Sequence, residues 1–220
     1  MNSIIAQIKA HRRYKIVITL TVVGLILLSI RVLSTQTILF TFLLWNLFLA
    51  LLPLVFSKSL RYSSRISNSK FLSVLFIILW LLFIPNSPYI VTDLKHVDND
   101  YGIQWFDLTL ILVFAINGLL IGIISMLDIF KLLQNKYSTK ITHSVVGLIC
   151  ILGGFGIFLG RFLRFNSWDI FTKPDTLFYS IFHTLFMKET WIWTILFGGF
   201  MWISFLLIKP LLVKKNIPAN

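Results

Sequence analysis

Six apolar runs, separated by short polar connections, form the main pattern of this 220-residue chain. A bilayer core about 30 Å thick needs roughly 20 apolar residues per helix, which most of these runs approach. The runs lack the alternation typical of barrel strands, and a helix satisfies its own backbone hydrogen bonds in lipid. We therefore predict an all-α, polytopic membrane helical bundle of about six transmembrane helices in a single integral membrane domain, residues 1–220. The predicted spans are 16–33, 38–56, 71–84, 105–127, 144–160 and 191–208.

Two polar connections on the same side, 85–104 and 161–190, are long enough to hold a functional site. Between Asp175 and Lys188, apolar residues recur at helical spacing, which predicts an amphipathic helix lying on the outer membrane interface. Pro174 and Asp175 suit its first turn, where a proline loses no needed donor and a carboxylate favours the positive helix end.

The third run, 71–84, is short for a membrane span. Its 14 residues extend about 21 Å as a helix, and the sequence P-N-S-P-Y-I-V-T-D follows, in which two prolines disfavour regular helix. We expect a broken helix that stays partly at membrane depth. In that position Asn86, Ser87 and Thr92 would line an outward-facing pocket, since irregular backbone there needs protein or water around it. A tight turn at the interface is the alternative.

Composition and charge support the membrane assignment and orient the bundle. The chain is 57% hydrophobic with a mean hydropathy of +0.88, so no separate soluble domain fits. Its net charge of +12 comes from Lys and Arg at the ends of apolar runs, which membrane topology explains better than nucleic-acid binding. Of the 20 basic residues, 14 lie on the side of both termini, together with only one acid, Asp128. This bias predicts a protein of the cell membrane with cytoplasmic N- and C-termini.

Acidic residues and a histidine gather on the predicted outer side, after the third run. In a helix capped by Ser87, the residues Tyr89, Asp93, His96 and Asp100 would share one stripe. Asp93 and His96 could hold Zn or Mn, with Asp107 or Asp169 as a third ligand. The same pair could act as a general base and its orienting carboxylate. An ordinary solvated helix face remains open, and the sequence identifies neither a metal nor a cofactor.

Two arginines, Arg161 and Arg164, follow the fifth apolar run one helical turn apart. Guanidinium groups bind phosphate and carboxylate in a bidentate manner, so a lipid headgroup or a phosphorylated envelope precursor is a reasonable ligand. Asn166 and Asp169 come directly after them. Alternatively, the arginines extend to the membrane interface, or they pair with acidic residues to hold helices together.

Other features of the spans favour packing over chemistry. We interpret Gly156 and Gly160, and the small-residue stripe of the fourth span, as helix-packing surfaces. Asn46 and Asn117 are expected to make hydrogen bonds between helices. No charged residue occupies the middle of a predicted span, which argues against a conventional proton relay, and no nucleotide-binding loop, H-E-x-x-H or G-x-S-x-G occurs.

Four motifs, in one order, carry a resemblance to a known family. They are W-N-L-F-L-A-L-L-P at 45–53, P-N-S-P-Y-I-V-T-D-L-K-H at 85–96, W-F-D-L at 105–108 and G-R-F-L-R-F-N-S-W-D at 160–169. With them the chain resembles the bacterial multi-pass membrane proteins catalogued as domain of unknown function 1361. Ser87, Lys95 and Phe165 depart mildly from the pattern, where alanine, a hydrophobic residue and tryptophan are expected. The resemblance implies a membrane location and no catalytic assignment.

These observations lead to one main hypothesis. An outward-facing polar pocket, built from 85–107 and 160–169, binds or processes an anionic cell-envelope or lipid-linked substrate. A transporter or channel component, or a structural or assembly subunit of a membrane complex, is the alternative. The candidate residues are Asp93, His96 and Asp107 for catalysis and Asn86, Arg161, Arg164, Asn166 and Asp169 for substrate binding.

Overall fold

The computed structural model describes the backbone of residues 2–97 and 104–212, and the side chains of residues 13–94 and 104–212. Its helices are α1 (Asn2–Thr35), α2 (Phe42–Tyr62), α3 (Ser64–Asn68), α4 (Lys70–Phe83), α5 (Asn86–Tyr89), the 3₁₀ helix η1 (Ile90–Val97), α6 (Gln104–Gln134), α7 (Thr139–Phe162), α8 (Asp169–Thr172), α9 (Pro174–Thr184) and α10 (Lys188–Leu212). The described part of the chain contains no strand, in agreement with the all-α prediction.

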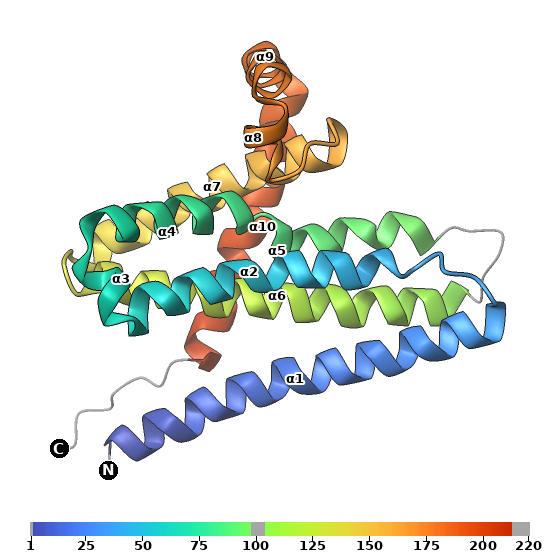
Figure 1. Cartoon of the computed structure of the whole chain (residues 1–220), viewed down its shortest axis with the longest axis horizontal. Coiled ribbons are helices and arrows are strands. Elements are labelled where there is room, and N and C mark those ends of the chain that lie inside the picture. The colour runs from blue at the N-terminus through green and yellow to red at the C-terminus, as the bar shows by residue number, and fades with distance from the viewer. Residues whose placement is uncertain (1, 98–103, 213–220) are drawn as a thin grey trace.

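Six helical segments are long and apolar enough to cross a membrane, as the sequence predicts. They are Arg13–Thr35, Phe42–Tyr62, Lys70–Leu94, Gln104–Gln134, Thr139–Phe162 and Lys188–Leu212. The third segment joins α4, α5 and most of η1, so these elements together supply the length that the 71–84 run lacks. Figure 1 shows α1, α2 and α6 lying along the long axis of the molecule, whereas α10 crosses that axis steeply.

The bundle has two ends that differ in charge, and we name each by a residue. The Asp93 end is where α1 ends, α2 begins and α7 ends. The Arg61 end is where α2 ends, α6 ends and α7 begins. The prediction that the Asp93 end faces outward rests on the distribution of Lys and Arg.

Helix α6 is the centre of the bundle. In its most apolar 18-residue window, 72% of the residues are buried, compared with 22–39% for the other five segments. It packs against α1, α2, α5 and η1, and its residues Leu110, Ile111, Phe114 and Ile121 are almost fully buried. The helices around α6 leave apolar side chains exposed, as expected where lipid is the solvent.

Glycines on α6 and α7 make room for the short helix α5. A methyl group added at Gly122 of α6 would lie 2.7 Å from Cβ of Ser87. On the opposite side, a methyl group at Gly156 of α7 would lie 2.6 Å from Pro85. Gly160, one turn further along α7, similarly faces the ring of Tyr89. The predicted packing role of these glycines is confirmed: Gly122 packs on α5, and Gly156 and Gly160 pack on the residues at its two ends.

The P-N-S-P segment is a distorted helix in which Ser87 and Pro88 are buried by protein. Its position at membrane depth stays a prediction. Ile84 and Pro85 keep right-handed helical dihedrals between α4 and α5. The expectation that Ser87 lines a pocket is wrong, because its side chain has no exposed area and donates to the Ala50 carbonyl oxygen at 3.1 Å. Thr92 donates to the Tyr89 carbonyl oxygen at 2.7 Å and so satisfies backbone instead.

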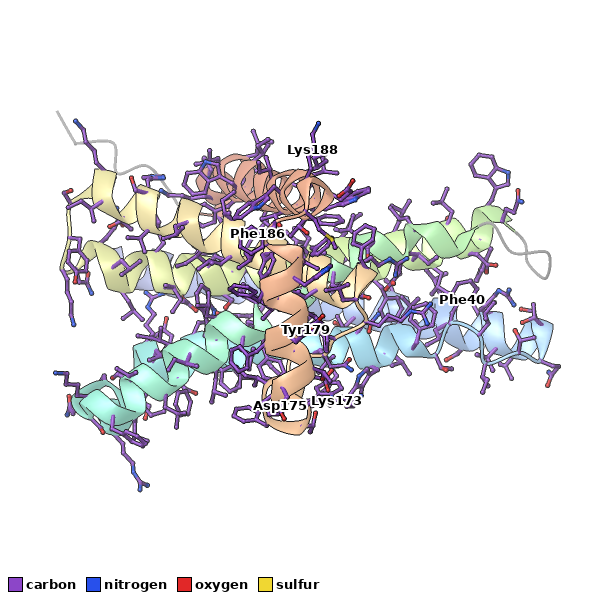
Figure 2. All side chains as sticks on the ribbon, turned by 90° about the horizontal axis from the view of Figure 1, so that it is seen from above. Phe40, Lys173, Asp175, Tyr179, Phe186 and Lys188 are labelled. Carbon is purple, nitrogen blue, oxygen red and sulfur yellow. The ribbon has the colours of Figure 1, made fainter. Side chains whose placement is uncertain are left out.

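The C-terminal part of the chain packs on α7. Helices α7 and α10 cross at Gly154 and Gly198, where an added methyl group on Gly154 would lie 2.5 Å from the Gly198 nitrogen. Helix α9 covers the predicted amphipathic segment only as far as Thr184. It runs across the long axis, as Figure 2 shows with the labelled Asp175 and Tyr179. It buries Leu177 and exposes an aromatic face that includes Tyr179 and Phe182. Its location at a membrane interface remains a prediction.

The glycine contacts of α5 generate a stability prediction. Gly122→Ala would force a methyl group against Ser87, so we expect it to lower the free energy of unfolding by about 1–3 kcal/mol. Gly199→Ala is the matched control, because an added methyl group there meets nothing within 4 Å. Thermal unfolding of both variants in detergent would measure the difference. Equal unfolding temperatures would contradict this account of α5.

Candidate functional site

Asp93 lies at the point where η1, α2 and α7 meet. It belongs to η1 and is only 2% exposed. The Asn46 amide of α2 donates to Oδ2 of Asp93 at 2.8 Å, and Arg161 Nη1 of α7 lies 3.4 Å from Oδ1. We call Asn46, Asp93 and Arg161 the Asp93 cluster.

The 3₁₀ geometry of η1 directs Asp93 into the bundle. Residues three apart eclipse each other in a 3₁₀ helix, so Asp93 faces the same side as Ile90, which has no exposed area. The predicted separation of Asp93 from Ile90 assumed a regular α-helix and is wrong. Asp100, the last member of the predicted stripe, lies outside the described residues. The side chain of His96 lies outside the described residues.

Arg161 is held next to Asp93 by helix packing but is incompletely paired. Gly156 and Gly160 of α7 pack against Pro85 and Tyr89. The following part of α7, which carries Arg161, therefore lies beside the following turn of the chain, which carries Asp93. The 3.4 Å contact is longer than the roughly 2.7–2.9 Å usual for a charge-assisted hydrogen bond. Nη2 of Arg161 is buried and has no hydrogen-bond partner among the described residues. This nitrogen of the guanidinium therefore lacks an acceptor among the described residues.

Arg164 lies at the exposed end of α7. Its φ of 60° lies in the left-handed region, and this conformation turns the chain away from the helix axis. The Phe165 N–H then donates back to the Leu159 carbonyl oxygen at 3.1 Å. The side chain is exposed and forms no hydrogen bond or ion pair with the residues that the structure describes. It is a cation open to the surroundings, one turn from Arg161.

The segment after Arg164 contacts residues of α2, α4 and α5. Ser167 accepts from the Asn86 amide at 2.9 Å and donates to the Leu82 carbonyl oxygen at 3.1 Å. The ring of Trp168 meets Trp45 edge to face, with centroids 6.0 Å apart. Asn86 therefore anchors this segment to the end of α4.

Asp169 stabilises its own turn instead of joining the Asp93 cluster. The Asn166 N–H donates to Oδ2 of Asp169 at 2.7 Å, and the Thr172 hydroxyl donates to Oδ1 at 2.8 Å. The backbone donor of Asn166, chiefly, lowers the pKa of Asp169 below its ordinary value. The Asn166 side chain itself is exposed.

Asp107 belongs to a different pair, with Arg31 of α1. Both side chains are at most 2% exposed, Nε of Arg31 bonds Oδ1, and Nη2 bonds Oδ2 at 3.1 Å. Nη1 of Arg31 bonds the Thr35 hydroxyl, and the Phe40 ring centroid lies 5.3 Å from the guanidinium carbon. The sequence reasoning missed Arg31, although it is an arginine on the predicted outer side, as Arg161 is.

No three His, Cys, Asp or Glu side chains lie together as a metal site within the part of the chain that the structure describes.

Asn46 was predicted to form a hydrogen bond between helices, which it does, but its role as a partner of Asp93 was not foreseen. The other membrane asparagine, Asn117, donates to the Thr21 hydroxyl of α1 at 2.8 Å, as expected for an interhelical bond.

Three of the four motifs that carry the family resemblance meet in space at this site. The Asp93 cluster takes one residue from each of three motifs, and the pairs Asn86–Ser167 and Trp45–Trp168 join the same motifs. The model of the family described as "Protein of unknown function (DUF1361)" matches residues 45–204, so the chain belongs to this family. No curated protein and no solved structure matches the chain.

The Arg31–Asp107 pair generates a second stability prediction. Arg31→Met would leave the Asp107 carboxylate buried without its cation, which we expect to lower the free energy of unfolding by about 3–5 kcal/mol. Adding Asp107→Leu should recover most of this loss, because an apolar pair needs no desolvated charge. Arg65→Met, at an exposed position of α3, serves as the control and should change stability by less than about 0.5 kcal/mol. Thermal unfolding of the four proteins tests this coupling, and no recovery in the double variant would contradict it.

Proposed function

We propose that this DUF1361 protein binds an anionic group of a lipid-linked or other cell-envelope substrate at the Asp93 end, through Arg161 and Arg164. The unpaired, buried Nη2 of Arg161 is the observation that carries the proposal. A buried donor without an acceptor costs about 1–3 kcal/mol, and more when it is charged. A phosphate or carboxylate oxygen would remove that cost.

The other arginine at this end provides a contrast. Arg31 bonds both oxygens of Asp107 and the hydroxyl of Thr35, and none of its nitrogens is buried without a partner. Such a saturated pair holds helices together. Arg161 keeps a free donor although a carboxylate lies beside it, which suits a group that takes a ligand.

The charge around Arg161 fits a single anionic group. Asp93 contributes one negative charge, and Arg161 and Arg164 contribute two positive charges, so the three carry +1. Asn46 holds Asp93 from the other side at 2.8 Å and fixes the carboxylate that keeps Arg161 in position. A bound phosphate or carboxylate would complete the guanidinium contacts in the bidentate geometry that arginine favours.

The aromatic residues beside the arginines fit a substrate with an apolar part. Trp45 is 53% exposed and packs against Trp168, which follows the arginines in the chain. Indole rings suit the boundary between headgroups and acyl chains. Together with the predicted outward orientation of this end, these contacts favour an envelope lipid or a lipid-linked precursor as the substrate.

Co-purification is the first test of the proposal. The full-length protein would be isolated in mild detergent from its native membranes as wild type, Arg161→Gln and Arg65→Gln, at matched amounts, and bound anionic lipids would be measured by mass spectrometry. We expect a species present with wild type and Arg65→Gln to fall about tenfold or more with Arg161→Gln, because a charged hydrogen bond contributes roughly 1.5–3 kcal/mol. Equal recovery of every anionic species from the three proteins would refute the proposal.

Asp93→Asn separates substrate binding from a structural ion pair. The amide keeps the shape of the side chain and removes the charge that competes with the substrate for Arg161, so we expect the amount of bound anion to increase. In a purely structural pair, the same change would lower the unfolding temperature and leave the bound lipids unaltered. Substrate that accumulates in cells carrying Asp93→Asn at normal abundance would in addition assign this carboxylate to a chemical step.

A further inference from the structure

A second group of cations lies at the opposite end of the bundle. It consists of Arg13 from α1, Lys58 and Arg61 from α2, and Lys131 from α6. We call these four residues the Arg61 cluster. All four side chains are partly buried. They lie at the ends of their apolar segments, the level at which lipid headgroups begin.

The Arg61 cluster is short of negative charge. Asp128 of α6 forms an ion pair with Nη1 of Arg61, and its second oxygen is buried without a partner among the described residues. Lys131 experiences the charges of Arg61 and Arg13 as well as that of Asp128. Four cations with one carboxylate carry +3, and this excess is concentrated where the dielectric constant is low.

The remaining contacts of the cluster are with neutral groups. The Lys58 ammonium lies 4.1 Å from the ring centroid of Tyr14 and 5.2 Å from that of Tyr62. Arg13 donates one hydrogen bond to the Leu212 carbonyl oxygen at the end of α10, and its Nε is buried with no acceptor among the described residues. Aromatic faces and a carbonyl orient these cations without neutralising them.

We infer that the Arg61 cluster binds the phosphate of an anionic lipid headgroup. Basic residues between membrane helices at the positively charged side form such sites, and a phosphate supplies several acceptor oxygens for the unpaired donors. An open surface of α1, formed by Lys15, Ile16, Thr19 and Leu20, begins within one turn of Arg13. Its apolar residues offer a place for an acyl chain, which favours a lipid over a free phosphate ion.

The test compares two pairs of charge removals at the same end of the molecule. Lys58→Gln/Lys131→Gln removes two cations of the Arg61 cluster. Lys136→Gln/Lys140→Gln removes two exposed cations outside the cluster, one between α6 and α7 and one in the first turn of α7. Purified full-length protein in detergent would be titrated with phosphatidylglycerol, phosphatidylcholine or inorganic phosphate, and bound lipid would be counted by native mass spectrometry with thermal unfolding as a second readout.

We expect phosphatidylglycerol to bind about 25-fold more weakly to Lys58→Gln/Lys131→Gln, at about fivefold per removed cation, and normally to Lys136→Gln/Lys140→Gln. Lys58→Arg/Lys131→Arg should retain binding, which separates lost charge from a damaged fold. Equal weakening in both Gln pairs, or equal binding of phosphatidylcholine, would overturn the site. Stabilisation by inorganic phosphate equal to that by phosphatidylglycerol would overturn the lipid assignment. Lys58→Gln/Lys131→Gln leaves Arg161 and Arg164 in place, so failure here and failure of the proposed function are distinguishable.

Discussion

Enclosure of the P-N-S-P backbone is the constraint on which the arrangement of the Asp93 end depends. Pro85 and Pro88 have no N–H to donate, so this stretch cannot form a complete helical ladder and is unstable when exposed to lipid. The glycines of α6 and α7 allow both helices to approach it closely, as the contacts of Gly122 and Gly156 show. Because α5 is fixed from both sides, η1 begins inside the protein and Asp93 reaches Asn46 and Arg161.

Charges that are removed from water need compensation, and the three ion pairs of the described residues differ in how fully they receive it. Arg31 and Asp107 satisfy each other almost completely. Asp93 accepts a hydrogen bond from the Asn46 amide, whereas one nitrogen of Arg161 has no hydrogen-bond partner among the described residues. At the opposite end, one oxygen of Asp128 has no such partner, although cations are in excess there. Desolvation makes such incomplete pairs costly unless another group contributes. The two incomplete pairs are therefore the places where the burial of charge is least compensated within the described residues.

The sequence predicted well what depends on local pattern. Continuous apolar runs indicated the membrane helices, and the spacing of Gly156 and Gly160 indicated a packing face. It did not predict which charges meet across helices, because spacing along the chain does not determine the distance between helices. Arg31 and Asp107 are 76 positions apart, and Asn46 and Asp93 are 47 apart. The orientation of Asp93 was missed because three residues turn through about 300° in an α-helix and about 360° in a 3₁₀ helix.

The extent of the family match separates the two arginine pairs. Residues 45–204 contain all of Asn46, Asp93 and Arg161, and also the glycines that position α5. They contain Asp107 but not Arg31, its partner on α1. The Asp93 cluster is thus formed entirely within the matched region. The Arg31–Asp107 pair instead joins α1 to α6, and Asn117 and Thr21 make a second polar link between the same two helices. Attachment of α1 and formation of the candidate site are therefore separate physical problems, solved by different residues at the same end of the bundle.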